Sequence, residues 1–161
     1  MATRLEQEIG NLLRERGLTI GIAESSTGGL ISHLITDVPG SSSYFKGAVV
    51  AYDNEVKIKI LGVKRETLEK YKSVSYQTGE EMAEGVREAM DVDIGLSETG
   101  IAGPTSGSSG KGVGLFYIGL SSRQGNLVSE HIFHGDRLEN KRSAAEAALA
   151  MLKEYLLGLN G

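Results

Sequence analysis

Short apolar runs alternate with segments of helical periodicity over the first hundred residues, and this alternation restricts the fold more than any other feature. Residues 18–23, 46–52 and 92–97 are the apolar runs, each of the length of one buried strand. Between them, apolar residues recur every three or four positions, as they do in helices that cover a sheet. The alternation therefore predicts an α/β protein.

The remainder of the chain adds a hairpin and a long helix. Residues 112–121 and 127–133 form two β runs on either side of R-Q-G-N, a pattern typical of an antiparallel hairpin. Gly17 and Gly62 are predicted to end two of the earlier helices, Ser75 to cap another, and Asp136 to cap the last helix. The apolar face of that last helix includes Leu138 and continues nearly to the C-terminus. We predict a single three-layer α/β/α domain over residues 1–161, with a mixed sheet and helices on both faces.

Charge and hydropathy exclude several classes of partner. The net charge is -4, and the Lys and Arg residues are scattered rather than clustered, which argues against nucleic acid or an acidic membrane. No run approaches the roughly 18 apolar residues of a membrane span, and the N-terminus is typical of an amphipathic helix rather than a signal peptide. We therefore expect a cytoplasmic protein, and a homo-oligomer, because small cytoplasmic α/β enzymes often form symmetric assemblies.

The residue types present limit the chemistry. The chain contains no cysteine and three histidines, His33, His131 and His134, so disulfides, thiolate nucleophiles and zinc–cysteine sites are excluded. A histidine-rich metal site is disfavoured by the same count, and we predict neither a metal nor a cofactor. Covalent chemistry would have to use a hydroxyl, an amine or a carboxylate.

The stretch A-E-S-S-T-G-G-L at residues 23–30 lies where the first strand is expected to turn into a helix. The first backbone donors of a helix have no internal partner, so Ser25, Ser26 and Thr27 can cap it, while Gly28 and Gly29 allow an anion to approach closely. A capped helix without a ligand explains the same residues equally well, so both interpretations stay open at this point.

The Gly-rich stretch at residues 99–112 fails the tests for common nucleotide-binding loops. Gly110-Lys111 is followed by Gly112 rather than Ser or Thr, and Thr105 stands where both the Walker and the dinucleotide patterns need glycine. Residues 105–112 are equally consistent with a flexible surface loop. Residues 100–104 follow a predicted buried strand, at the sheet edge where α/β proteins bind ligands.

Two patterns for serine hydrolases receive little support. Ser43 and Lys46 have the Ser-x-x-Lys spacing of penicillin-recognising acyltransferases, but the companion motifs of that class are missing. The chain contains no G-x-S-x-G sequence, and no histidine is placed by sequence beside a serine, so a Ser-His-Asp triad is disfavoured.

Six ordered motifs give the chain a resemblance to the CinA C-terminal domain family, over nearly its whole length. They are A-E-S-S-T-G-G-L at 23–30, D-V-P-G-S-S at 37–42, Y-D-N-E-V-K at 52–57, L-G-V at 61–63, T-G-I-A-G-P at 99–104 and G-D-R at 135–137. The family includes amidohydrolases that convert nicotinamide mononucleotide into nicotinic acid mononucleotide and ammonia. The resemblance implies that reaction here, with nicotinamide mononucleotide as the small-molecule partner.

The resemblance also implies roles for individual residues. Ser25 matches the family's nucleophile, Lys57 its base and Tyr52 the tyrosine that assists or orients. The residues expected to bind substrate are Ser26, Thr27, Gly28, Gly29, Asn54, Gly100, Ile101, Ala102, Gly103 and Arg137. Backbone N–H groups at Thr27–Gly29 would hold the oxyanion or the phosphate, and Arg137 is the candidate for the phosphate. As structural alternatives, Tyr52 is a core aromatic and Arg137 a solvated helix residue.

Two departures from the family pattern leave other functions open. Ser26 stands where family members often carry cysteine, so two hydroxyls are adjacent, and residues 105–112 lack the usual acidic-Lys-Pro ending. A non-catalytic nucleotide-binding module that retains the pocket is the alternative to an enzyme. Hydrolysis of a different amide is a third interpretation.

Overall fold

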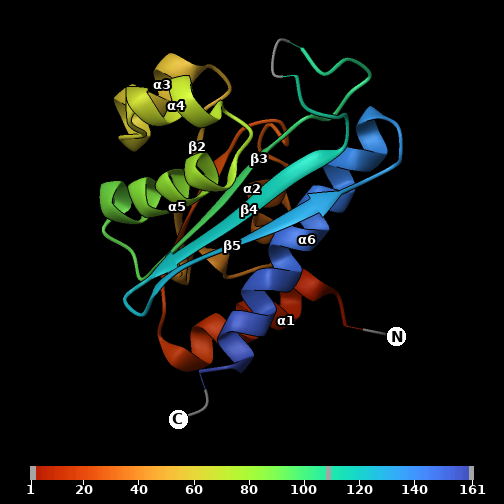
Figure 1. The fold of residues 1–161 in the computed structure, drawn as a ribbon. Helices are drawn as coiled ribbons and strands as arrows, with labels where there is room; N and C mark the ends of the chain where they lie inside the picture. The colour runs from red at the N-terminus through yellow and green to blue at the C-terminus, as the bar shows by residue number, and fades with distance from the viewer. Residues whose placement is uncertain (1–2, 108–109, 160–161) are drawn as a thin grey trace.

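A five-stranded mixed sheet lies between two layers of helices in the computed structural model, which describes residues 3–107 and 110–159 (Figure 1). The strand order is β2-β1-β3-β4-β5; β1, β2 and β3 are parallel, whereas β4 and β5 form an antiparallel hairpin. The strands are β1 Ile20–Glu24, β2 Phe45–Val50, β3 Ile94–Gly100, β4 Leu115–Ser122 and β5 Gly125–Ile132. The predicted single domain with a mixed sheet and flanking helices is confirmed.

Each face of the sheet is covered by a separate group of helices. On one face, α1 (Leu5–Arg16) and α2 (Leu30–Thr36) pack against α6 (Arg137–Leu157). On the other, α3 (Asn54–Leu61) and α4 (Arg65–Tyr71) pack against α5 (Tyr76–Met90), which lies on the sheet. A short 3₁₀ helix, η1 (Ser41–Ser43), precedes β2. In the described residues, no helix is both long and apolar enough to cross a bilayer.

Several helix ends are set by local sequence, as predicted. Gly17 and Gly62 end α1 and α3 in the left-handed conformation, at φ values of 64° and 71°. The Ser75 and Asp136 side chains cap α5 and α6, and Asp136 forms a capping box with Glu139. Because these signals act within a few residues, they could be read without the tertiary structure.

Two burial predictions were wrong. Strand β2 was predicted to be buried, but it is an edge strand whose residues alternate between partly buried and exposed. Leu138 was assigned to the apolar face of α6, yet it is 66% exposed. The first turn of α6 meets a loop rather than the sheet, since Arg137 and Asn140 donate hydrogen bonds to the carbonyls of Gly103 and Ala102.

Strands β1 and β3 extend further than the apolar runs that predicted them, and each includes a glutamate. Glu24 closes β1 and Glu98 lies within β3, and both side chains are fully buried. The parallel strands β1, β2 and β3 direct their carboxyl ends to one edge of the sheet. The two carboxylates therefore lie beside the turn that follows β1.

Candidate active site

Ser25 and Lys57 are brought together at this edge of the sheet. Ser25 follows β1 directly, and Lys57 extends from α3, which follows β2. Lys57 Nζ lies 3.2 Å from Ser25 Oγ and also donates to the carbonyl oxygens of Ala51, at 2.8 Å, and Tyr52, at 3.3 Å. The predicted nucleophile and the predicted base are thus in direct hydrogen-bond contact.

Helix α3 places Lys57 inside the protein. Asp53 caps the helix by accepting from the Glu55 N–H, and Lys57 and Leu61, one turn apart, are its buried residues. Lys57 is only 1% exposed. A lysine therefore occupies a core-facing position that would ordinarily carry an apolar side chain.

Burial changes the acid–base behaviour of Lys57. Loss of hydration disfavours the ammonium and lowers the pKa of Lys57 below its ordinary value, while the negative charges of Glu98 and Asp53 oppose that change in part. A lysine can act as a general base only in its neutral form. The lowered pKa increases the neutral fraction near physiological pH.

The predicted capping of α2 by Ser25, Ser26 and Thr27 was wrong. Gly29 is the N-cap, with φ at 111°, and no side chain of the turn caps the helix there. Glu24 instead reaches back to the helix start, where its carboxylate accepts from the N–H groups of Gly29, Ile31 and Ser32 and from the Ser32 hydroxyl. The end of the helix dipole that favours anions is thus already occupied by a carboxylate of the chain.

The N–H groups of Thr27–Gly29, which we predicted to bind an oxyanion or a phosphate, are engaged within the protein. The Thr27 N–H donates to Glu98 at 3.0 Å, the Gly28 N–H to the Ser25 carbonyl at 3.1 Å, and the Gly29 N–H to Glu24 at 3.1 Å. Each of these donors has a protein acceptor. The Gly-rich turn therefore shapes the site without offering those three amides to a ligand.

A cavity of about 820 Å³ opens in front of the Ser25–Lys57 pair. Most of the predicted site residues line it: Ser25, Ser26, Tyr52, Asn54, Lys57, Gly100, Ile101, Ala102, Gly103 and Arg137. Thr27, Gly28 and Gly29 do not. In the described residues, no group of three or more histidine and acidic side chains is arranged to hold a metal ion.

Tyr52 and Arg137 lie together at the outer part of the cavity. The Arg137 guanidinium donates to the Gly103 carbonyl at 2.6 Å and to the Tyr52 hydroxyl at 3.3 Å. Tyr52 is 63% exposed, so it is not a core aromatic. Its backbone carbonyl, rather than its hydroxyl, contacts Lys57.

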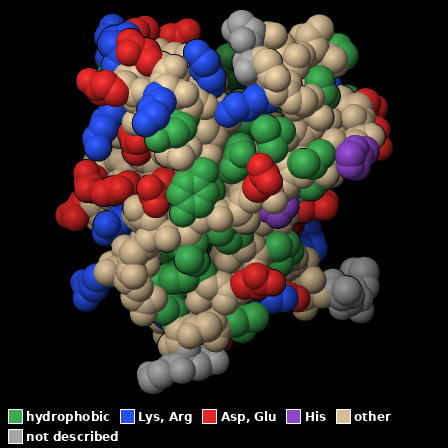
Figure 2. Space-filling view, viewed as in Figure 1, with side chains coloured by type: hydrophobic (Ala, Val, Ile, Leu, Met, Phe, Trp, Pro, Cys, Tyr) green, Lys and Arg blue, Asp and Glu red, His purple; other side chains and the backbone are tan. Residues whose placement is uncertain are grey.

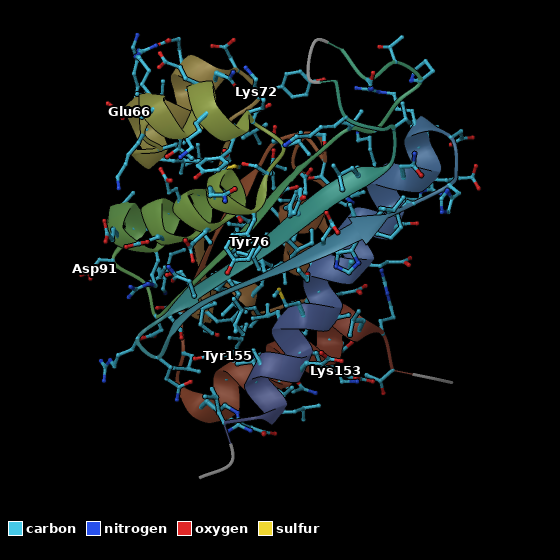
Figure 3. The ribbon with its side chains drawn as sticks, in the orientation of Figure 1. Glu66, Lys72, Tyr76, Asp91, Lys153 and Tyr155 are labelled. Carbon is cyan, nitrogen blue, oxygen red and sulfur yellow. The ribbon has the colours of Figure 1, made fainter. Side chains whose placement is uncertain are left out.

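Other residues of the cavity were missed by sequence reasoning. Arg65, which forms an ion pair with Glu55 at 2.8 Å, and Lys72 both line it. Lys72 directly follows α4 (Figure 3). Figure 2 shows acidic and basic side chains mixed over α3 and α4. Glu98 was missed too, although a carboxylate inside the strand sequence I-G-L-S-E-T could have indicated it, because a buried carboxylate needs hydrogen-bond partners.

Comparison with known sequences finds a family and relatives that match nearly all of this chain. The model of the CinA C-terminal domain matches residues 2–156. A putative competence-damage inducible protein of Halothermothrix orenii is 52% identical over 155 residues, covering 96% of this chain and 38% of that protein. A CinA-like protein of Dictyoglomus thermophilum is 51% identical over 157 residues, covering 98% of this chain and 38% of that protein. The chain thus spans less than half the length of these relatives.

Solved structures of similarly named proteins have the same fold as this chain. The competence damage-inducible protein A of Klebsiella pneumoniae superposes with a TM-score of 0.94 at 29% identity and covers 97% of each chain. A competence/damage inducible protein of Agrobacterium tumefaciens gives a TM-score of 0.86 at 34% identity, covering 97% of this chain and 98% of the other. On the family match, the sequence identities and the shared fold, this chain belongs to the CinA C-terminal domain family.

Proposed function

We propose that this protein hydrolyses the carboxamide of nicotinamide mononucleotide, releasing ammonia and nicotinic acid mononucleotide through an acyl-enzyme on Ser25. The observation that carries the proposal is the contact between Ser25 Oγ and the buried Lys57 Nζ beside an open cavity. A serine hydroxyl is a weak nucleophile until a base removes its proton, and a desolvated lysine is a base of the required kind. The choice of substrate rests on the family resemblance.

In the first half of the reaction, neutral Lys57 accepts the Ser25 proton while Oγ bonds to the carboxamide carbon, and the carbonyl oxygen becomes an oxyanion. The Ser26 N–H is the candidate donor to this oxyanion. It is the amide of the turn for which no acceptor is found among the described residues, and it follows the nucleophile directly. When the intermediate collapses, the carbon–nitrogen bond breaks and the Lys57 ammonium gives its proton to the leaving nitrogen.

In the second half, a water molecule replaces ammonia. Lys57, neutral again, accepts a proton from this water, and the resulting hydroxide bonds to the acyl carbon. The ester bond to Ser25 then breaks, and Oγ recovers the proton from Lys57. The product is released as the carboxylic acid, which loses its proton to solvent and becomes the carboxylate, and the enzyme returns to its starting protonation state.

The outer cavity would hold the rest of the nucleotide. Arg137 is our candidate for the phosphate, because its guanidinium lies at the cavity and can form paired hydrogen bonds with phosphate oxygens. Asn54 and residues 100–103 would form walls around the ribose and the ring. The volume of about 820 Å³ falls in the range of small-molecule sites.

The test is ammonia release by the purified chain from nicotinamide mononucleotide, with free nicotinamide and nicotinamide riboside as comparison substrates. We expect turnover of the mononucleotide, weaker turnover without the phosphate, and loss of about 10⁴-fold in kcat in Lys57→Met. Methionine fills the same volume without a proton acceptor, so this variant is expected to fold.

Other results would point elsewhere. Saturable binding of the mononucleotide without any ammonia would identify a non-catalytic nucleotide-binding module. Ammonia released only from a different carboxamide would retain the mechanism and replace the substrate.

A further inference from the structure

Glu98 lies inside the sheet, yet within residues 3–107 and 110–159 all the donors to its carboxylate come from the turn that carries Ser25. Its side chain is 0% exposed. Oε1 accepts from the Ser25 N–H at 2.9 Å, from the Thr27 N–H at 3.0 Å and from the Thr27 hydroxyl at 2.7 Å. Oε2 accepts a hydrogen bond from the Ser26 hydroxyl. One carboxylate from β3 thus holds three consecutive residues that follow β1.

This arrangement fixes the shape of the chain at the nucleophile. The amides of Ser25 and Thr27 converge on a single oxygen, so the backbone of Ser26 between them bends around that atom. Hydrogen bonds to a charged acceptor are about twice as strong as neutral ones. The direction of the Ser25 side chain and of the Ser26 N–H therefore depends on Glu98.

Glu98 also acts on the base. Together with Asp53, its negative charge favours the ammonium form of Lys57 and opposes the effect of burial. The other ionisable side chains lining this cavity lie on α3, α4 and α6 and in the segments beside them: Tyr52, Glu55, Arg65, Glu69, Lys72 and Arg137. They include both signs of charge, and none of them is among the groups that change the pKa of Lys57.

We propose that Glu98 is a positioning residue for the reaction proposed above: its carboxylate holds the Ser25 turn in its reactive shape and supplies the negative charge that faces Lys57 after Lys57 has taken the serine proton. This inference rests on the proposed function for its kinetic consequence. The effect of the Glu98 charge on the titration of Lys57 does not depend on that reaction and can be measured in the protein without substrate.

Glu24, the last residue of β1, provides a matched control. It is equally buried, and its Oε1 also lies 2.7 Å from the Thr27 hydroxyl, whose single proton the two glutamates share, but its remaining bonds go to the start of α2. Glu24 is not among the causes of the Lys57 shift. Two fully buried carboxylates that share one hydroxyl are thus expected to differ in their effect on Lys57.

The experiment compares Glu98→Gln, Glu98→Asp and Glu24→Gln with wild type in two measurements. The first is the titration of Lys57 by NMR on lysine-labelled protein without substrate, assigned by its loss in Lys57→Met. The second is the pH dependence of kcat for ammonia release. Glutamine retains an acceptor but removes the charge, whereas aspartate retains the charge but is too short to keep every bond to the turn.

We expect the two Glu98 variants to distinguish the effect of its charge on Lys57 from the effect of its hydrogen bonds on the Ser25 turn. In Glu98→Gln, the Lys57 titration and the acidic limb of kcat move down by about one pH unit, because an opposite charge has been removed, and the plateau of kcat falls about tenfold. In Glu98→Asp, the Lys57 titration stays within about 0.3 unit of wild type while kcat falls about 10²-fold. Glu24→Gln leaves the Lys57 titration in place.

An unchanged Lys57 titration in Glu98→Gln, or an equal shift in Glu24→Gln, would overturn the electrostatic part of the proposal. Wild-type kcat in Glu98→Asp would overturn the positioning part. If the wild-type protein releases no ammonia at all, the proposed function is refuted, whereas the NMR titration still decides whether Glu98 acts on Lys57.

Discussion

The inner and outer parts of the cavity are built differently. The inner part, Ser25, Lys57 and Glu98, is buried, and every member is hydrogen-bonded to residues of a different segment of the chain. The outer part includes Tyr52 and Arg137, which are exposed and share one hydrogen bond. A reacting centre has to be held rigidly, whereas side chains that contact a ligand can be ordered by that ligand. In the proposed reaction, bond breaking would take place at the inner part and substrate binding at the outer part.

The largest expected effect on stability comes from Glu24→Ala, at the residue that directly precedes Ser25 of the inner part. This change leaves the N–H groups of Gly29, Ile31 and Ser32 without their acceptor, so we expect the free energy of unfolding to fall by about 2–4 kcal/mol. Urea unfolding measures it. Glu24→Gln, which retains one acceptor oxygen, should lose about half as much. A loss below about 0.5 kcal/mol in Glu24→Ala would show that water replaces the carboxylate without cost.

That prediction concerns a residue whose role could not be derived from sequence. The alternation of apolar runs and helices predicted the three-layer fold, and Gly17, Gly62, Ser75 and Asp136 marked helix ends, because these signals are local. The carboxylates were missed because a glutamate in a strand is buried only when distant backbone donors satisfy it. The ordered motifs, rather than spacing, indicated the Ser25–Lys57 pair, whose members lie on different elements.

In the outer part, Arg137→Ala tests binding without disturbing the catalytic pair. We expect KM for nicotinamide mononucleotide to rise about 10- to 100-fold, with kcat within about threefold of wild type, because a phosphate contact is present in both the ground and the transition state. Steady-state kinetics measures both constants, and Arg137→Lys should recover part of the loss in KM. A fall in kcat with unchanged KM would show that Arg137 acts in bond breaking rather than in substrate binding, which would contradict the distinction between the inner and outer parts.

The smallest effect is expected for Tyr52→Phe. Only the hydrogen bond from Arg137 to the phenol is lost, while the Tyr52 carbonyl that contacts Lys57 remains. We expect kcat/KM to fall less than about fivefold, because this hydrogen bond is exposed to solvent, which weakens it even though its donor is charged. The same assay measures it, and a fall above about 10²-fold would assign the Tyr52 hydroxyl a direct part in proton transfer.

The central claim is that Ser25 Oγ, and not the adjacent Ser26 hydroxyl, is the nucleophile. The Ser25 hydroxyl is hydrogen-bonded to Lys57, whereas the Ser26 hydroxyl is hydrogen-bonded to Glu98. Only the Ser25 hydroxyl therefore has the proposed base as its partner. The most direct measurement is ammonia release from nicotinamide mononucleotide by Ser25→Ala and Ser26→Ala, two variants that each lose a single oxygen. We predict a loss of about 10⁴-fold or more in Ser25→Ala and less than about 10²-fold in Ser26→Ala. Wild-type turnover in Ser25→Ala would contradict the account.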